Sequence, residues 1–316
     1  MLKYFLKLLT PKDFEHSLRQ LLPNPEDHTF LLAVSGGVDS MVLLDLFRSL
    51  NFGFQVAHVN YHLRGDDSNA DQQLVQDYCT KHHIKFHLYE VSEKDERPQH
   101  SIQNWARNLR YAFFAKVRHE EKIDFLVTAH HLNDQLETFL INLSRGTGIK
   151  GLTGIPANDN QILRPLLHFT KEELYDFANL HQIAFREDLS NMKNDYLRNR
   201  VRHNTVPELT QLNPQFLIQF GATISHLKQS NQFIENSVNK AFSAVIMKNL
   251  DNGFVIDKKK LMEHDPFLVR EIMRKLGFAG DEIGKVIGAE NGKLFRSKSF
   301  ELQISKNEIT CCRRTV

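Results

Sequence analysis

A short turn that holds two glycines and a carboxylate constrains the fold of this chain more than any other segment. An apolar run at 31–34 precedes the turn, and residues 41–47 follow it with apolar side chains at helical spacing, which predicts a strand, a turn and a helix. Glycines let the backbone approach a phosphate, and the start of a helix offers N–H groups and a positive dipole end to an anion. We therefore expect an anion-binding turn made of Ser35, Gly36, Gly37, Val38, Asp39 and Ser40.

Asp39 is an unexpected residue in such a turn, because its carboxylate would repel a phosphate. A divalent cation between the two groups removes the conflict, so we expect Asp39 to bind Mg²⁺ together with a nucleotide such as ATP. The turn lacks the lysine of the GxxxxGK[ST] phosphate loop and is therefore of another type. The alternative is an ordinary glycine turn in which Asp39 or Ser40 caps the following helix.

The first two thirds of the chain alternate short β-rich runs with segments of helical length. The expected strands are residues 31–34, 54–60, 84–91 and 124–130, and the expected helices between them include residues 71–82 and 101–120. This alternation predicts an α/β fold with a doubly wound, mainly parallel sheet. In such a sheet ligands bind at the carboxyl ends of the strands, near the switch in strand order.

A different pattern follows residue 207 and predicts a second, smaller α+β domain. Its expected elements are helices at 215–245 and 266–276, a strand at 254–257 and a hairpin formed by residues 300–304 and 309–311. We divide the chain into residues 1–210 and residues 211–316.

The composition is that of an ordinary globular protein, with 41% hydrophobic and 25% charged residues. No apolar run approaches the ~20 residues that cross a bilayer, and residues 1–9 lack a signal-peptide pattern, so we expect a cytoplasmic protein without membrane contact. Cys79, Cys311 and Cys312 provide neither a disulfide framework nor a CxxC pair. The net charge of +2 alone does not indicate nucleic-acid binding.

The segment after the fourth expected strand, residues 128–138, is the richest in ionisable groups. If a helix begins there, His130, Asp134 and Glu137 lie on one face. Two carboxylates one turn apart can hold an ammonium group or a metal, and a histidine can carry a proton. The spacing does not match HExxH, which argues against structural zinc. A solvated helix face is the alternative.

Basic residues gather in three further places. Arg107 and Arg110 lie one helical turn apart, which suits a surface pair or two anion contacts. A loop with four glycines at 144–154 suits phosphates or a sugar backbone, although such loops are also plain connections. Its polar residues are Arg145, Thr147 and Lys150, and a third basic group downstream consists of Arg198, Arg200 and Arg202.

Taken together, these strings resemble the tRNA(Ile)-lysidine synthetases, a family of ATP pyrophosphatases. The matching strings are SGGVDS (35–40), HVNYHLRG (58–65), ARNLRY (106–111), TAHHLNDQLETFL (128–140), RGTGIKGLTGIP (145–156), RPLL (164–167), EDLSN (187–191) and YLRNRVRHNTVPEL (196–209). The resemblance implies an adenine nucleotide alpha hydrolase-like fold for the first domain. One departure is the segment 101–105, where the family often has a glutamate and this chain has none.

The resemblance implies a two-step reaction with ATP and Mg²⁺. ATP adenylates the carbonyl oxygen on carbon 2 of the wobble cytidine in an isoleucine tRNA with a CAU anticodon and releases pyrophosphate. The side-chain amine of free L-lysine then attacks carbon 2 and displaces AMP to give lysidine. Residues 35–40 would bind ATP, and Asp39 would act with the metal as pyrophosphate leaves. Asp134 and Glu137 would grip the lysine, with His130 and Arg110 near the nucleotide or the cytidine.

The same resemblance implies contacts with tRNA phosphates. Arg145, Thr147 and Lys150 would contact tRNA or phosphate, and the second domain would contact the tRNA as well. Arg198, Arg200 and Arg202 would line the same cleft or face tRNA phosphates. For the last three arginines, ion pairing with Glu187 and Asp188 is the alternative. The chain resembles the shorter members of the family, and a homodimer is possible.

Two other functions are compatible with the turn at 35–40. A tRNA sulfur-transfer enzyme would use the same turn, but such enzymes usually need clustered cysteines, and Cys79 stands alone in the first domain. An ATP-binding module without catalytic activity would need the turn but would not explain Asp134 together with Glu137.

Overall fold

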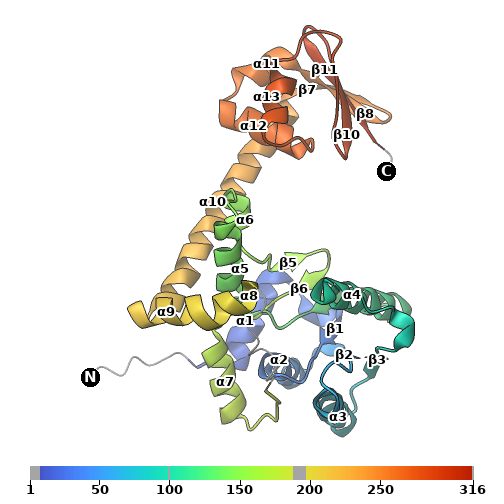
Figure 1. The fold of residues 1–316 in the computed structure, drawn as a ribbon, viewed down its shortest axis with the longest axis vertical. Coiled ribbons are helices and arrows are strands. Elements are labelled where there is room, and N and C mark those ends of the chain that lie inside the picture. Colours follow the sequence, from blue (N-terminus) through green and yellow to red (C-terminus); the bar gives the residue numbers. More distant parts are fainter. Residues whose placement is uncertain (1–7, 99, 188–196, 315–316) are drawn as a thin grey trace. The chain divides into compact units, whose positions relative to one another are not determined.

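The computed structural model describes residues 8–98, 100–187 and 197–314, which form two compact units, Met1–Ser225 and His226–Val316 (Figure 1). The division falls within the long helix α10 (Phe216–Val245). Residues 1–7, at the start of the segment for which we expect no signal peptide, and Asp188 lie outside the described residues. Within the described ranges, no helix is long and apolar enough to cross a membrane.

The first unit is built on one sheet with the strand order β3-β2-β1-β4-β6-β5. Every neighbouring pair is parallel except β5 with β6, which confirms the expected α/β class. The strands are β1 (Thr29–Ala33), β2 (Gly53–Asn60), β3 (Phe86–Glu90), β4 (Phe125–Val127), β5 (Asn158–Asp159) and β6 (Ile162–Leu163).

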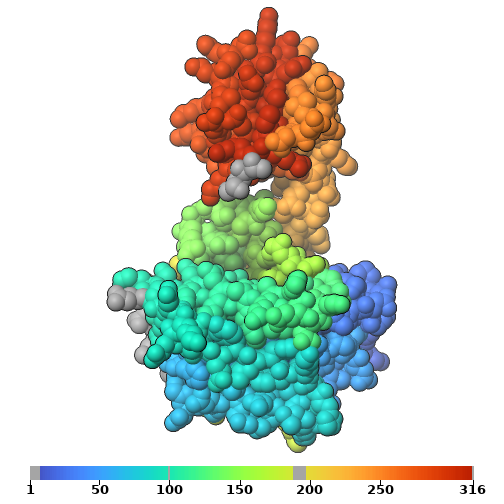
Figure 2. Space-filling model, turned by 90° about the vertical axis from the view of Figure 1, so that its right-hand side faces the viewer, coloured from blue at the N-terminus to red at the C-terminus, as the bar shows by residue number. Residues whose placement is uncertain are grey.

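Helices cover both faces of this sheet, and for that reason β1 is apolar throughout after its first residue, Thr29. Phe30 and Leu32 of β1 pack in the core that α1, α2, α3 and α7 share, whereas Leu31 faces Phe114 and Val117 of α4. Figure 2 shows the face of this unit over which α4 lies. The helices are α1 (Pro11–Leu21), α2 (Val38–Ser49), α3 (Asp66–Lys81), α4 (Ile102–Glu121), α5 (Leu132–Ser144), α6 (Ile149–Leu152), α7 (Lys171–Leu180), α8 (Leu197–Arg200) and α9 (Val206–Leu212).

The strand order places a topological switch between β1 and β4. The chain runs from β1 to β2 and β3 on one side and then crosses to β4 on the other side of β1. The turn at 35–40 follows β1 and the segment at 128–131 follows β4, so both segments leave the same edge of the sheet at the switch. Ligands of doubly wound sheets bind at this place.

The second unit has its own antiparallel sheet, with the order β7-β8-β11-β10-β9, and its own core. The hairpin of β10 and β11 is confirmed, while β7, α11, α13 and β9 were not among the expected elements. The elements are β7 (Ile246–Leu250), β8 (Gly253–Asp257), α11 (Lys258–Glu263), α12 (Pro266–Lys275), α13 (Asp281–Ile287), β9 (Leu294–Arg296), β10 (Phe300–Ile304) and β11 (Glu308–Arg313).

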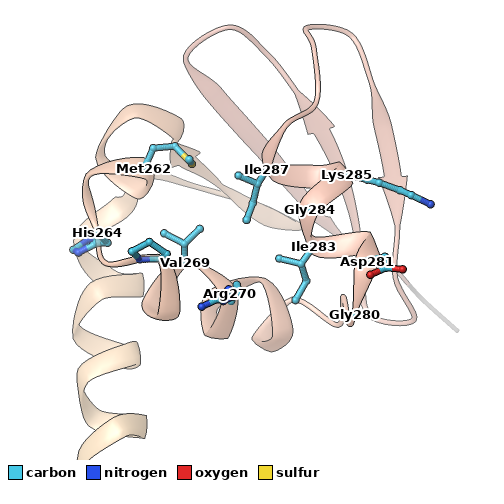
Figure 3. A pocket seen from close by; sticks show the side chains of 11 residues that line it. Met262, His264, Val269, Arg270, Gly280, Asp281, Ile283, Gly284, Lys285 and Ile287 are labelled. Carbon is cyan, nitrogen blue, oxygen red and sulfur yellow. The ribbon is translucent and has the colours of Figure 1, made fainter.

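A pocket of about 650 Å³ lies among α11, α12 and α13 of the second unit. Figure 3 shows the apolar side chains of Val269, Ile283 and Ile287 turned toward the hollow, with Arg270 at its edge. Val269 and Ile283 are buried, so the floor of this pocket is the outer layer of the unit's own core.

Candidate functional site

The turn after β1 is organised by the hydroxyl group of Ser40. This hydroxyl donates to the Gly37 carbonyl (2.9 Å) and accepts the Ser35 backbone N–H (3.1 Å), which closes the turn onto the first residues of α2. The N-cap position of α2 is Gly37, which has no side chain to cap the helix. Neither Asp39 nor Ser40 is the N-cap, so the alternative of an ordinary helix cap is wrong. The first turn of α2 keeps N–H groups available for an anion.

Gly36 takes a conformation that other residues rarely adopt, with φ of +94°. A Cβ built on this residue would lie 3.3 Å from the Cβ and carbonyl oxygen of Asp71. The Gly36 carbonyl also accepts the backbone N–H of Arg186 (3.0 Å), whose guanidinium pairs with Asp71. The turn is therefore held between α3 and the segment after α7.

We expect Gly36→Ala to lower the free energy of unfolding by about 1–2 kcal/mol, because the added Cβ is strained at this φ and meets Asp71. Chemical denaturation measures the change. Gly284→Ala is the control, since Gly284 lies within α13 with no atom within 4 Å of an added Cβ, and alanine is the better helix former. Equal effects of the two substitutions would contradict the account of the turn.

Asp39 lies in the first turn of α2 with its two carboxylate oxygens in different settings. Oδ2 is 3.5 Å from His131 Nε2 and 3.9 Å from Lys171 Nζ. Oδ1 is buried and has no hydrogen-bond partner in the described part of the chain. A buried carboxylate oxygen without a partner is costly, and a cation would satisfy it.

The surroundings of Asp39 fit magnesium better than a metal held by protein groups alone. Within the described ranges no group of three or more His, Cys, Asp or Glu side chains could hold a metal ion. Mg²⁺ commonly takes one or two carboxylates and completes its shell with water and substrate phosphates. Asp39 alone, beside an anion-binding turn, offers that kind of site.

Helix α5 begins at Leu132, two residues after His130, so His130 does not share a helical face with Asp134 and Glu137. His131 is the N-cap of α5, and Asp134 Oδ2 accepts the His131 backbone N–H (3.1 Å) in a capping box. The expected single helical face is therefore wrong for His130, which precedes the helix. Asp134 and Glu137 do share α5, and both are buried.

Asp134 and Glu137 form an ionic cluster with two of the predicted arginines. Arg198 donates from Nε to Glu137 (2.7 Å) and from its terminal nitrogen to Asp134 (2.8 Å). Arg202 donates from Nε to Glu137 Oε1 (2.5 Å) and from its terminal nitrogen to Oε2 (3.1 Å). These two arginines pair with the carboxylates of α5 rather than with Glu187; Asp188, the other partner considered, is not described.

The pKa values of the two adjacent histidines are shifted in opposite directions. Burial lowers the pKa of His130 to about 4, and His130 Nδ1 shares a hydrogen bond with the Thr128 hydroxyl (2.8 Å). Burial also disfavours charge on His131, but the carboxylates of Asp134 and Asp39 outweigh it and raise the pKa of His131. Burial alone would raise the pKa of Asp134, but the neighbouring histidines and Arg198 outweigh it and lower that pKa. His131, which we did not single out from the sequence, thus sits between two site carboxylates.

We expect NMR titration of the histidine ring protons to separate these two residues. His130 should stay neutral until about pH 4, whereas His131 should titrate above its ordinary value of 6.5. By linkage, the lowered pKa of His130 decreases the free energy of unfolding as the pH falls from 6.5 toward 4. The raised pKa of His131 has the opposite effect: it adds to the free energy of unfolding below pH 6.5, and this contribution is lost as the pH rises through the folded pKa. Assignment uses His130→Gln and His131→Gln, and two ordinary titrations near 6.5 would contradict this electrostatic account.

A cavity of about 710 Å³ connects these groups at the switch in strand order. The turn contributes Ser35, Asp39 and Ser40, and the segment after β4 contributes His130 and Asp134. The cavity is also lined by side chains from α4, from the loop after β2, from α8 and from the turn after α8; among them are Arg107, Arg110, Gln103, Asn104, Tyr61, Arg198 and Arg202.

The α4 side of the cavity presents two cations stacked on one ring. The guanidinium of Arg107 lies 4.7 Å from the Tyr111 ring centre, and that of Arg110 lies 5.9 Å from it. Tyr61 donates its hydroxyl to the Ala106 carbonyl (2.9 Å), which fixes the loop after β2 to α4. Gln103 and Asn104 also line the cavity and were missed, because a polar pair before ARNLRY carries no pattern of its own.

The glycine-rich loop lies apart from the residues that line this cavity. Arg145 and Thr147, which follow α5, and Lys150 on α6 are exposed, and none of them lines the cavity. Buried Gln135 bonds both backbone groups of Ile155, so the end of the loop is anchored to α5. Arg200 is exposed on α8 and is likewise outside the cavity lining. The predicted phosphate contacts of these four residues stay predictions.

The cysteines do not form a reactive cluster. Cys79 is buried in α3, where burial raises its pKa to about 12. Cys311 is also buried and Cys312 is exposed, both on β11 of the second unit. None of the three lines the cavity of the first unit.

Comparison with known proteins matches residues 10–209 to the PP-loop domain family, which is more than half of the chain. The parallel sheet and the SGGVDS turn at its switch point are thus those of a PP-loop protein, and the chain belongs to this family. A solved structure of U34-tRNA thiolase NcsA from Methanococcus maripaludis has the same fold, with a TM-score of 0.56, 17% identity and coverage of 68% of this chain and 78% of that chain.

Curated relatives place the chain more narrowly. A tRNA(Ile)-lysidine synthase of Chlorobaculum tepidum is 37% identical over 74% of this chain and 73% of its own length. Those of Enterococcus faecalis and Bacteroides thetaiotaomicron are 37% and 32% identical over 75% and 89% of this chain. The chain belongs to the tRNA(Ile)-lysidine synthase family, and it spans 52% and 66% of the length of the latter two relatives.

Proposed function

We propose that this protein uses ATP to join L-lysine to carbon 2 of the wobble cytidine of an isoleucine tRNA with a CAU anticodon. The reaction passes through an adenylated tRNA and releases pyrophosphate and then AMP. The observation that carries the proposal is the cavity at the switch point. It is lined by the anion-binding turn, by Asp39 and by Asp134, the member of the carboxylate pair that reaches the cavity; Glu137 is not among the lining residues.

In this proposal the turn binds the phosphates of ATP. Backbone N–H groups of Ser35–Ser40 and the N-terminus of α2 point at the nucleotide. Asp39 holds Mg²⁺ through its unpartnered oxygen, and the metal supplies neutralisation of the pyrophosphate charge. Arg107 and Arg110 face the same cavity from α4, and Arg110 adds positive charge near the reacting groups.

The second substrate is assigned to the other side of the cavity. Asp134 and Glu137 are buried carboxylates that suit the ammonium group of lysine. His130 is neutral at physiological pH, with its pKa near 4, so it accepts a hydrogen bond rather than adding charge beside the cytidine. We assign contacts with tRNA or with phosphate to Arg145, Thr147, Lys150, Arg198, Arg200 and Arg202, and tRNA contact to the second unit.

The charge of the second unit supports its assignment to tRNA. Residues 226–316 hold 16 Lys or Arg against 11 Asp or Glu, whereas residues 1–225 hold 24 against 27. An excess of positive charge favours a polyanion. Sulfur transfer is the weaker candidate, because none of the three cysteines lines the cavity and two of them have a buried sulfur.

Incubation with ATP labelled at the α-phosphate tests the order of the two steps. Without lysine, we expect label to accumulate on the isoleucine tRNA, and added lysine should release it as AMP. A methionine tRNA, which carries the same anticodon letters, is the control and should stay unlabelled. Release of AMP without any tRNA, or no transfer of label to tRNA, would contradict the adenylated intermediate.

A further inference from the structure

The oxygens of both carboxylates assigned to lysine are already occupied by hydrogen bonds from this chain's own groups. Asp134 accepts Arg198 on Oδ1 and the His131 backbone N–H on Oδ2. Glu137 accepts Arg202 on Oε1 and both arginines on Oε2. Each of the four oxygens already accepts a hydrogen bond, so a lysine ammonium would compete with a guanidinium for its place.

Simple removal of an arginine from this cluster is unfavourable. Glu137 is 2% exposed, and a buried carboxylate that loses a cation partner is left with uncompensated charge, which is strongly destabilising. The arginine must therefore be replaced by another cation as it leaves, and it must find another anion. The incoming lysine ammonium supplies the first of these groups.

The phosphates of the nucleotide supply the anion that a departing arginine needs. Arg198 and Arg202 line the same cavity as Ser35 and Ser40 of the anion-binding turn. Their side chains are 42% and 29% exposed, against 3% for Glu137, so they reach the carboxylates from the open side. A guanidinium binds carboxylate and phosphate with the same two-pronged geometry, which makes it suited to an exchange between them.

The backbone that carries the two arginines is also unusual. Arg198 is on α8, and Arg202 is in the π-helical turn Val201–Thr205 that joins α8 to α9. Single turns of π-helix occur often at functional sites. The wider turn carries Arg202 itself and separates Arg198 from α9.

We infer that Arg198 and Arg202 hold the lysine site closed until a nucleotide binds, and then exchange the carboxylates of Asp134 and Glu137 for phosphate oxygens. The inference rests on the proposed function, because it takes lysine and ATP as the ligands. Nucleotide binding then opens the ammonium site. By reciprocity, bound lysine strengthens nucleotide binding by the same factor.

Calorimetry of lysine binding tests this coupling directly. The nucleotide is α,β-methylene-ATP with Mg²⁺, which cannot be cleaved between the α and β phosphates. We expect the unmodified protein to bind lysine at least about 10-fold more tightly with the analogue than without it, which corresponds to a coupling within the usual range. In Arg198→Gln, lysine should bind more tightly than in the unmodified protein when no nucleotide is present, and the gain from the analogue should shrink.

Arg19→Gln is the matched control, since Arg19 pairs with Glu15 and Glu26 on the surface, and it should keep the full coupling. A purely structural role for Arg198 would weaken lysine binding in the variant without changing its dependence on nucleotide. Equal lysine affinity with and without the analogue would overturn the exchange while leaving lysine as a substrate. Absence of lysine binding under both conditions would overturn the proposed function, and the exchange with it.

Discussion

Asp39→Asn should lower the rate of tRNA adenylation by about 100-fold or more, because the amide removes the charge that holds the metal beside the leaving pyrophosphate. The fold should remain intact. Asp39 Oδ1 has no hydrogen-bond partner among described residues, and Oδ2 approaches His131 and Lys171 only at 3.5 and 3.9 Å, so we expect a change in unfolding free energy within about 1 kcal/mol. Activity is measured as pyrophosphate release with isoleucine tRNA, and stability by thermal unfolding.

Asp77→Asn is the control for the chemical change, since Asp77 is exposed on α3 and bonds only to Gln73 among the contacts described. It should leave both activity and stability unchanged. Raising the Mg²⁺ concentration should restore part of the activity of Asp39→Asn if the loss is one of metal affinity. Full activity of Asp39→Asn at ordinary Mg²⁺ would show that the metal is held elsewhere.

Glu137→Gln should damage both stability and activity, because Glu137 is the central anion of the cluster. Its loss leaves Arg198 and Arg202 facing one carboxylate, that of Asp134. Removal of one partner of a buried ion pair costs about 3–5 kcal/mol, and the partial exposure of both guanidiniums reduces this to about 2 kcal/mol. We expect lysidine formation to fall by about 100-fold or more, because the same carboxylate is assigned to the lysine ammonium.

The matched control is Glu301→Gln, which makes the same chemical change in a surface pair with Arg296. The side chains of that pair are 34% and 62% exposed, and it should contribute less than about 1 kcal/mol. Chemical denaturation compares the two variants, and the adenylation step should survive in Glu137→Gln better than lysine transfer. Equal stability losses at Glu137 and Glu301 would show that the cluster is not a buried one.

The fold was predictable from local sequence because its signals are local. The apolar run before Ser35 is a strand covered on both faces, and the alternation up to His131 predicted the parallel sheet. The start of α5 was misplaced because the capping box uses His131 and Asp134, which is not one of the usual Ser, Thr, Asp or Asn signals. Strands β5 and β6 have only two residues each and carry no periodicity.

The sequence allowed us to predict which residues belong to the site, but not which of them pair with one another. Asp134, Glu137, Arg198 and Arg202 were each marked by charge pattern or by resemblance, yet the ion pairs span more than 60 residues of sequence. No spacing rule reaches that far, because the pairing depends on how the segment at 197–205 returns to α5. The role of His131 was missed for the same reason, since its pKa depends on burial and on Asp134 and also on Asp39, which belongs to a different element.

The most direct test of the whole account is the transfer of radiolabelled lysine to tRNA. Unmodified protein, ATP and Mg²⁺ are incubated with transcripts of an isoleucine tRNA carrying CAU and, separately, of a methionine tRNA. We expect ATP-dependent incorporation at the wobble cytidine of the isoleucine tRNA and none into the methionine tRNA. Absence of incorporation into the isoleucine tRNA, or label found in both transcripts alike, would contradict it.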